Sequence, residues 1–429
     1  MSVDGHARAC IVAAPSSGQG KTWITAALAR KWARAGQRVR VFKTGPDFID
    51  PEILTRASGG AVHTLDLWMA GDEQCAQQLS EAARNSDVVL VEGVMGLFDG
   101  TPSTADLAQR FGLAVLLVVD ASAMAQTFGA VVHGLMDYRP ELRFAGVVAN
   151  RVAGAGHAEM LLGSLRDRTA WHGAIGNDAT TTLPERDLGL VMPSEIDDLD
   201  AKLERAADSV VSIDLDRFPR LELPELAPAK LTATLRGVRI AVARDAAFCF
   251  AYPANLELLR TLGAELRFFS PCDDREIPEA DALYLPGGYP ELHVQALAQN
   301  TSMRTALRAH IAANKPTLAE CGGLMWLARG LRTRDGVRHE MAGVLDLEVE
   351  MQAKLVSIGH YECAFDEGSL RGHAYHYSQA RGGAFVAESA TSPHGGRAEP
   401  VYRQRRLVAS YVHWYLPSNP ALATQLFTP

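Results

Sequence analysis

A glycine-containing segment near the start of the sequence has the composition of a phosphate-binding loop. Residues 15–22 read Pro-Ser-Ser-Gly-Gln-Gly-Lys-Thr and lie between an apolar run and a stretch with helical patterning. Inward-turned N–H groups and the positive end of the helix dipole would attract phosphate. Lys21 can reach the β- and γ-phosphates and the Thr22 hydroxyl can bind magnesium, although Pro15 stands where the usual pattern has a glycine. We expect an ATP site at Ser17, Gly18, Gln19, Gly20, Lys21 and Thr22.

Four acidic residues follow two later apolar runs. They are Asp47, Asp50, Glu92 and Asp99. Ligands of open α/β sheets bind at the carboxyl ends of the strands, so we expect these side chains to gather there. Because Mg²⁺ prefers oxygen ligands and shares nucleotide phosphates, we expect Thr22, Asp47 and Glu92 to hold it. Asp50 and Asp99 would then serve the substrate or the catalysis.

Some alternatives stay open for the residues around this loop. Asn150 ends another apolar run, and its amide could read the edge of adenine, although a turn asparagine fits nearly as well. Any one of the four acids, taken alone, fits a solvated loop residue or a helix cap. Together, beside a phosphate loop, they favour a metal and substrate site.

A second set of chemically active residues lies in the last third of the sequence. Residues 317–326 form an apolar run that breaks at Cys321 into glycines and a helical stretch, the pattern of a nucleophile at a sharp turn. A helix N-terminus lowers the pKa of a thiol. The N–H groups of residues 287–288, with that of Gly322, can form an oxyanion hole, and His413 is available as general base. A lone cysteine is more often a small buried hydrophobic residue, but these surroundings favour a nucleophile.

The oxyanion-hole residues that we expect are Gly287, Gly288 and Gly322.

The hydrophobic pattern indicates the elements that must position these residues. Nearly continuous apolar runs recur at residues 10–14, 39–42, 87–91, 114–119, 145–149, 238–242, 282–285 and 317–319. Such runs suit strands that are buried on both faces of a parallel sheet. Helical patterning separates them, as in residues 22–35, where Gly36 can end the helix. The alternation predicts an α/β, doubly wound fold in the first half and a second α/β unit after it.

Length and composition bound the organisation of the chain. A chain of 429 residues is too long for one hydrophobic core. Residues 221–230 hold two prolines and no clear periodicity, which is typical of a linker. We predict a P-loop domain at residues 1–225, a linker at 226–236 and a second domain at 237–429.

The bulk numbers also narrow the partners. A hydrophobic content of 47% is that of a soluble globular protein, and a net charge of −8 argues against a nucleic-acid partner. Six scattered cysteines without a C-x-x-C pair favour a reducing cytoplasm over a disulfide framework or a zinc site. The apolar runs are too short to cross a membrane. A homodimer stays open.

Longer motifs in both halves resemble known families. The second half is similar to a class I glutamine amidotransferase domain of the cobyric acid synthase type, and the first half resembles the dethiobiotin synthetase-like P-loop fold. Over essentially the whole chain, the sequence resembles the family of cobyrinic acid (or hydrogenobyrinic acid) a,c-diamide synthases. The motifs that carry the resemblance are residues 45–51, 92–99, 286–291, 320–323, 372–378 and 412–413.

The resemblance implies a reaction and roles for individual residues. The a- and c-acetate side chains of a corrin would become acetamides, and each amidation would consume one ATP and one glutamine. ATP would phosphorylate the carboxylate, and ammonia would attack the acyl phosphate. The implied magnesium ligands are Asp47 and Glu92. Asp50 and Phe48 would border the substrate, and Asp99 would assist the phosphoryl or amide chemistry.

One departure from the family pattern matters. Many class I glutaminases continue His-x-Glu, but here the segment reads His413-Trp-Tyr415. We therefore predict a Cys321–His413 dyad, with any steadying group not revealed by the sequence. His373 and His376 share a probable strand and could line a site, although structural histidines fit at least as well. Because ammonia is protonated in water, we also expect an internal path from Cys321 to the ATP site.

Two other functions remain as alternatives. A partitioning-type ATPase would bind macromolecules, but such proteins carry an extra lysine early in the loop, where this chain has Ser16. A sibling amidotransferase would act on another tetrapyrrole or on other corrin carboxylates, although residues 47–50 favour the diamide enzyme. The sequence does not decide whether the corrin contains cobalt, which amide forms first or which arginines bind the substrate.

Overall fold

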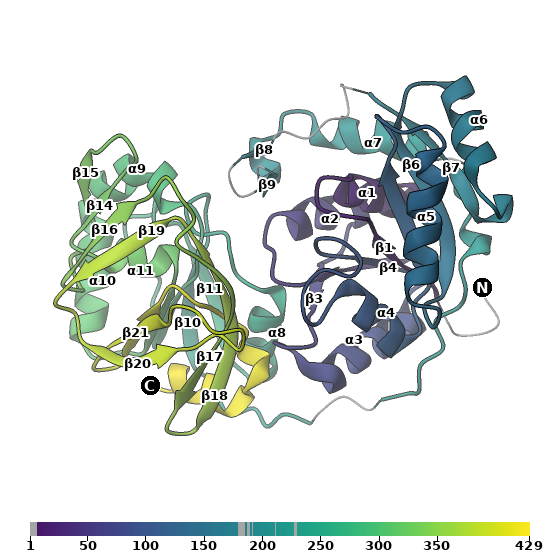
Figure 1. The fold of residues 1–429 in the computed structure, drawn as a ribbon. Coiled ribbons are helices and arrows are strands. Elements are labelled where there is room, and N and C mark those ends of the chain that lie inside the picture. Colours follow the sequence, from purple (N-terminus) through teal and green to yellow (C-terminus); the bar gives the residue numbers. More distant parts are fainter. Residues whose placement is uncertain (1–6, 179–184, 187–188, 191, 211, 227–229) are drawn as a thin grey trace. The chain divides into compact units, whose positions relative to one another are not determined.

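The computed structural model describes residues 7–178, 185–186, 189–190, 192–210, 212–226 and 230–429. The chain divides into two compact units, residues 1–228 and 229–429, and each is described by itself (Figure 1). Residues 227–229 of the predicted linker lie outside the described residues, and its other residues form no helix or strand. The linker boundaries stay a prediction. No helix in the described part of the chain is long and apolar enough to cross a membrane.

Unit 1 is built on a parallel sheet. Its seven described strands are, in spatial order, β3 (His63–Leu65), β2 (Val39–Thr44), β4 (Val88–Glu92), β1 (Arg8–Ala13), β5 (Val115–Asp120), β6 (Phe144–Val152) and β7 (Trp171–Gly176). Every hydrogen-bonded pair among them is parallel. Side chains alternate between the faces, so Ile11 and Val89 enter one core while Cys10 and Leu90 enter the other.

Helices cover both faces of this sheet (Figure 1). One core contains residues of α3 (Gly71–Asn85), α4 (Thr104–Phe111), α5 (Thr127–Tyr138) and α6 (Ala155–Ser164). The other contains residues of α1 (Lys21–Arg34), α2 (Asp50–Ser58) and α7 (Leu199–Ser209). Smaller elements are η1 (Arg168–Ala170), β8 (Glu185–Arg186), β9 (Gly189–Leu190), η3 (Pro193–Glu195) and η4 (Leu215–Arg217). The predicted doubly wound fold is confirmed.

Unit 2 contains a second α/β sheet. Its seven described strands are β11 (Glu265–Phe269), β10 (Arg239–Ala243), β12 (Ala282–Leu285), β13 (Thr317–Glu320), β22 (Leu407–Ser410), β21 (Glu399–Gln404) and β20 (Val386–Ala390). The first five run parallel to one another. β21 pairs antiparallel with β22, and β20 pairs antiparallel with β21. One core includes α8 (Pro253–Thr261) and α12 (Pro420–Phe427), and the other includes α9 (Val294–Gln299), α10 (Thr301–Ala312) and α11 (Gly322–Leu327). Two 3-10 helices, η5 (Pro290–Leu292) and η6 (Leu416–Ser418), complete the described helices of this unit.

The chain between α11 and β22, together with residues 413–414, forms smaller sheets that the hydrophobic pattern did not predict. One has the strand order β15 (Arg338–Glu340), β14 (Gly330–Arg332), β16 (Leu347–Met351), β19 (Ser378–Gly382); the other has the order β17 (Ser357–Phe365), β18 (Gly368–His376), β23 (His413–Trp414). The strand expected around His373 and His376 is confirmed as β18. β22 stops at Ser410, and His413 begins the separate strand β23, which pairs with β18.

Candidate active sites

The phosphate loop lies where the strand order of the unit 1 sheet reverses. β1 is flanked by β4 and β5, and the chain leaves its carboxyl end into residues 14–20. Open α/β sheets bind ligands at such a point. Gly18 and Gly20 have φ values of 77° and 92°, a region that glycine enters readily. A Cβ on Gly20 would lie 2.3 Å from the amide nitrogen of Asn150, so the loop needs a glycine there.

Two amide side chains tie this loop to the ends of neighbouring strands. Nδ2 of Asn150 donates to the Gln19 carbonyl at 2.9 Å, and Oδ1 accepts from the N–H of Arg151 at 3.0 Å. The side-chain oxygen of Gln19 accepts from the N–H of Asp120 at 2.8 Å. In this structure the Asn150 amide therefore positions the loop. Its contact with adenine stays a prediction.

A buried lysine that the sequence analysis missed lies among the predicted carboxylates. The ammonium of Lys43, near the end of β2, donates to Asp50 Oδ2 and Glu92 Oε1, at 2.7 Å each. The Thr22 hydroxyl lies 2.7 Å from the same Glu92 oxygen and 3.1 Å from the same Asp50 oxygen. A lysine one residue before the end of a buried strand is a local hint of it, but the partners of Lys43 lie in other elements.

The remaining predicted residues lie around this cluster. Asp47 Oδ1 accepts from the N–H groups of Ile49 and Asp50 at 2.8 and 3.2 Å, and its Oδ2 lies 3.7 Å from the Lys43 ammonium. Phe48 follows Asp47 in the sequence, and its side chain is partly buried. The structure thus brings Asp47 into the group, but Asp50 is the one that contacts Thr22.

Asp99 belongs to the loop after β4, beside the phosphate loop. Its Oδ2 accepts from the N–H of Gly96 at 3.0 Å, and a Cβ on Gly96 would lie 2.5 Å from both that oxygen and the carbonyl oxygen of Pro15. The Lys21 ammonium donates to the Met95 carbonyl of the same loop at 2.6 Å. The two loops therefore pack closely around Lys21.

Charge and burial set the protonation of this cluster. Burial lowers the pKa of Lys43, but Asp50 and Glu92 outweigh burial and raise it above its usual range. Burial raises the pKa of Glu92. For Asp50, the Lys43 charge outweighs burial and lowers the pKa. Burial, together with Asp50, raises the pKa of Asp47 to about 8. Burial and then the Lys43 charge lower the pKa of Lys21 to about 8.

The donor set around Thr22 fits a magnesium ion that arrives with a nucleotide. Among the residues that the structure describes, no three His, Cys, Asp or Glu side chains converge to hold a metal by themselves. Mg²⁺ usually takes one or two protein carboxylates and completes its shell with water and phosphate oxygens. The Thr22 hydroxyl and the carboxylates 2.7 and 3.1 Å from it are oxygen donors of that kind.

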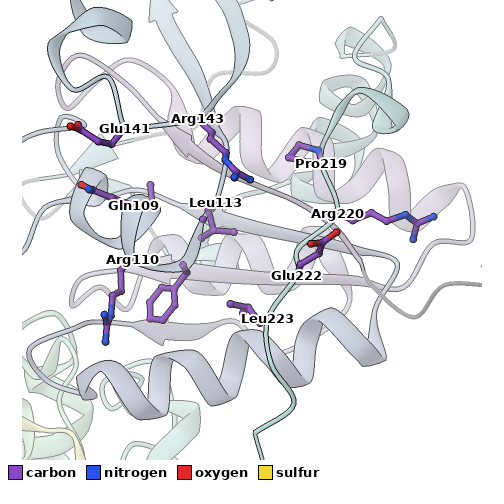
Figure 2. Close-up of a pocket in the computed structure, with 12 residues that line it drawn as sticks. Gln109, Arg110, Leu113, Glu141, Arg143, Pro219, Arg220, Glu222 and Leu223 are labelled. Carbon is purple, nitrogen blue, oxygen red and sulfur yellow. The ribbon is translucent and has the colours of Figure 1, made fainter.

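The cavity in Figure 2 is separate from these residues. It measures about 610 Å³ and is lined by residues 108–113, 141, 143, 219, 220, 222 and 223. Leu113 lies just upstream of β5 and Arg143 immediately precedes β6, so the cavity lies at the amino ends of these strands. The phosphate loop is at the opposite, carboxyl edge of the same sheet.

In unit 2, three adjacent strands deliver the predicted thiol site. β12, β13 and β22 lie side by side, and the chain beyond them reaches Gly287, Cys321 and His413 respectively. Cys321 has φ 42° and ψ −100°, and its N–H donates to the Ser410 carbonyl at 2.8 Å. A positive φ is costly for a residue other than glycine and is often found where a side chain must be presented. This is the sharp strand-to-helix turn that the sequence predicts.

The glycines predicted as an oxyanion hole are packed around this turn. A Cβ on Gly322 would lie 3.0 Å from the Gly288 nitrogen, and a Cβ on Gly287 would lie 2.1 Å from Cε1 of His413. The backbone of the residue 287–288 loop thus touches both the base and the residue after Cys321. Its role in oxyanion binding stays a prediction.

The thiol and the imidazole are both buried and neutral in this ligand-free structure. Burial raises the pKa of Cys321, and the nearby Glu291 raises it further. Burial, followed by His376, lowers the pKa of His413 to about 3. The Gly322 N–H at the N-terminus of α11 lowers the thiol pKa, as expected, but the loss of solvation around Cys321, which is 6% exposed, outweighs it. The net shift of the thiol pKa is therefore upward.

The two histidines of β18 lie next to this pair. The His373 ring is stacked on that of His413, with centroids 5.0 Å apart, and Tyr252 bonds its Nδ1 at 2.6 Å. The His376 ring is stacked on Tyr411 with centroids 3.9 Å apart. The sequence did not decide the role of the two histidines. It gave no indication of Tyr252 or Tyr411, because no local pattern marks these tyrosines.

Comparison with known proteins finds relatives over nearly the full length of the chain. Residues 10–188 match the model of the CobQ/CobB/MinD/ParA nucleotide binding domain, and residues 239–421 match that of the CobB/CobQ-like glutamine amidotransferase domain. The chain is 53% identical to the hydrogenobyrinate a,c-diamide synthase of Stutzerimonas stutzeri, over 98% of both chains. It is 51% identical to that of Pseudomonas aeruginosa, over 98% of this chain and 97% of the relative. It is 48% identical to the cobyrinate a,c-diamide synthase of Herminiimonas arsenicoxydans, over 99% and 97%. The chain therefore belongs to the family of hydrogenobyrinate and cobyrinate a,c-diamide synthases.

Proposed function

We propose that this chain is a ligase that amidates the a- and c-acetate carboxylates of cobyrinic or hydrogenobyrinic acid, with ATP and glutamine as co-substrates. The names of its relatives and the two matched domain models support this assignment. The observation that carries it is the presence in one chain of a phosphate loop beside the Lys43–Glu92 pair and of a buried Cys–Gly–Gly turn that, like His413, packs against the residue 287–288 loop. Other corrin carboxylates are the alternative substrates.

Unit 1 would activate the carboxylate. The N–H groups of residues 17–22 would hold the ATP phosphates, and the carboxylate oxygen would attack the γ-phosphorus to give an acyl phosphate and ADP. Thr22 and Glu92, with Asp47 or Asp50, would hold Mg²⁺, which neutralises phosphate charge when it is bound. The cluster already sets several carboxylates against two ammonium groups, so added phosphates call for a divalent cation. Lys21 would contact the phosphates directly.

Unit 2 would release ammonia. The Cys321 sulfur would attack the carboxamide carbon of glutamine, while His413 takes the thiol proton and passes it to the leaving ammonia. The N–H groups of Gly287, Gly288 and Gly322 would stabilise the oxyanion. Water would hydrolyse the γ-glutamyl thioester to glutamate. The ammonia would attack the acyl phosphate of unit 1 and release phosphate as the amide forms.

Replacement of the nucleophile tests this division of labour. Cys321→Ala should abolish amidation with glutamine and leave amidation with ammonium salts, whereas the control Cys249→Ala should keep both. Mass spectrometry of the corrin product of the parent enzyme should show two carboxyl groups converted to amides and no more. If Cys321→Ala keeps the glutamine reaction, or also loses the ammonia reaction, the proposed pair of sites is wrong. Addition of more than two amides would favour another set of corrin carboxylates.

The free cysteines support the proposal of a cytoplasmic setting. No disulfide joins any of the six, all of which lie among the described residues. Free thiols of this number support a reducing compartment, and we place the enzyme in the cytoplasm on that ground. A homodimer remains a prediction, which light scattering at several protein concentrations would test.

A further inference from the structure

The segment after the catalytic base departs from the His-x-Glu pattern of many class I glutaminases. A base in a triad is held in the correct orientation by a third group. Two residues beyond His413 stands Tyr415, whose own N–H donates to the Arg371 carbonyl. The segment that lies against His413 is instead β18 with its continuation to Ser378, which we call the double-histidine segment (residues 372–378).

Backbone pairing places this segment directly on the base. In the antiparallel pair of β18 and β23, His373 lies opposite His413. A Cβ on Gly372 would lie 2.2 Å from the His413 carbonyl oxygen, so a glycine is needed for this approach. The two imidazole rings are nearly parallel, with an interplanar angle of 18° and a centroid distance of 5.0 Å. Cross-strand neighbours on one face interact in this way.

The His373 ring is itself anchored. The Tyr252 hydroxyl and His373 Nδ1 are 2.6 Å apart, and the Tyr252 ring packs edge-on against Tyr415 with centroids 5.4 Å apart. Tyr252 is 2% exposed and His373 is 4% exposed, so neither has room to turn away. The His413 ring also lies against the backbone at Gly287. The base is therefore held by two separate contacts.

The second half of the double-histidine segment supports the chain just before the base. The His376 ring stacks on Tyr411 at 3.9 Å with an interplanar angle of 9°, and the Ser378 hydroxyl donates to the Tyr411 hydroxyl at 3.1 Å. His376 Nε2 lies 3.3 Å from Glu399 Oε1. Tyr411 packs in the same core cluster as Cys321. One segment thus contacts both ends of residues 411–413.

We propose that His373 is the positioning residue of the glutaminase base and orients it by ring stacking, with Tyr252 as its anchor. This inference rests on the proposed glutamine chemistry of Cys321. A stacked neutral ring fixes the tilt of His413 without adding negative charge. It acts through the base and touches no substrate.

The test separates stacking from general structural support. His373→Ala should lower the glutaminase kcat by about 100-fold, the loss typical of a misplaced catalytic group, with KM little changed. His373→Phe keeps a flat ring and should restore most of that loss. Tyr252→Phe removes only the anchoring hydroxyl and should lower kcat about fivefold, the equivalent of one hydrogen bond. Amidation with ammonium salts should be unchanged in all three variants, as should the glutaminase activity of the control His339→Ala in β15.

The outcomes that would overturn the positioning role of His373 differ from those that would overturn the proposed glutamine chemistry of Cys321. A parental kcat in His373→Ala or in Tyr252→Phe overturns the positioning role, as does a His373→Phe variant that is as slow as His373→Ala. A shared loss of glutaminase and ammonia-dependent activity would also overturn it, because the effect would then be structural. Glutaminase activity in Cys321→Ala would instead defeat the proposed function.

Discussion

The two sites use the same position in a sheet but opposite electrostatics. In both units the functional residues follow the carboxyl ends of adjacent parallel strands. In unit 1 a buried ammonium, Lys43, is paired with the carboxyl groups of Asp50 and Glu92. In unit 2 burial keeps both the Cys321 thiol and the His413 imidazole neutral. The difference matches the reagents that each site would handle, because a nucleotide brings charge that must be balanced, whereas the amide of glutamine is neutral.

The means of holding the residues differ as well. Unit 1 relies on ion pairs and hydrogen bonds around Lys43 and Thr22, which fail when a charge is removed. Unit 2 relies on close packing of rings and glycine backbone around His413, which fails when an atom is added or a ring is lost. Removing a charge from unit 1 and adding volume to unit 2 are therefore the changes that test the comparison.

Loss of the buried ammonium should have the largest effect. Lys43→Met leaves Asp50 and Glu92 buried without their cation, which should destabilise unit 1 by about 3–5 kcal/mol and abolish ATP-dependent amidation. Thermal unfolding and amidation with ammonium salts would measure both effects. The control is Lys31→Met, since the Lys31 ammonium bonds the Val210 and Ile213 carbonyls away from the loop. Parental amidation by Lys43→Met would show that the cation is dispensable.

A single methyl group added to either loop should separate the two activities. Gly287→Ala drives a Cβ into the His413 ring and should lower glutaminase activity by about 100-fold, while the ammonia reaction persists. Gly20→Ala combines a φ of 92° with a Cβ 2.3 Å from the Asn150 amide, and should weaken ATP use while glutaminase activity persists. Steady-state assays of each half-reaction would show the reciprocal pattern. Equal damage to both activities by either variant would contradict separate sites.

Local patterns in the sequence predicted much of the fold and the site. The buried strands, the phosphate loop and the turn at Cys321 each depend on residues that are neighbours in sequence, so their patterns were sufficient. Lys43 could not be placed among the carboxylates because its partners Asp50 and Glu92 come from different elements. The stack of His373 on His413 depends on strand pairing across about forty residues, which no local pattern specifies.

The smaller sheets of unit 2 and the thiol pKa escaped prediction for related reasons. The strands between α11 and β22 are partly exposed, as in β15, where all three residues retain solvent contact, so they lack the continuous apolar runs of the main sheet. The pKa of Cys321 depends on burial, which is set by the whole of unit 2. The helix that follows Cys321 was predicted correctly, but its dipole is the weaker influence.

The smallest expected effect concerns the neutral state of the thiol. Glu291 follows the residue 287–288 loop, and burial raises its pKa to about 7. Above pH 7 it is ionised and its charge raises the pKa of Cys321, whereas below pH 7 it is protonated and neutral. Glu291→Gln should therefore react faster than the parent with iodoacetamide at pH 8.5, by about fivefold for a Coulomb energy on the order of 1 kcal/mol, and equally fast at pH 6.

Mass spectrometry would follow the alkylation of Cys321 separately from that of the other cysteines. The exposed Glu367, in the turn between β17 and β18, provides the control Glu367→Gln, which should match the parent at both pH values. A faster reaction of Glu291→Gln at pH 6 as well would mean that shape rather than charge governs access to the thiol. Equal rates at pH 8.5 would mean that the Glu291 charge does not reach it. The predicted pattern would show that burial and the Glu291 charge keep the Cys321 thiol neutral. In this the glutaminase site differs from the ion-paired site of unit 1.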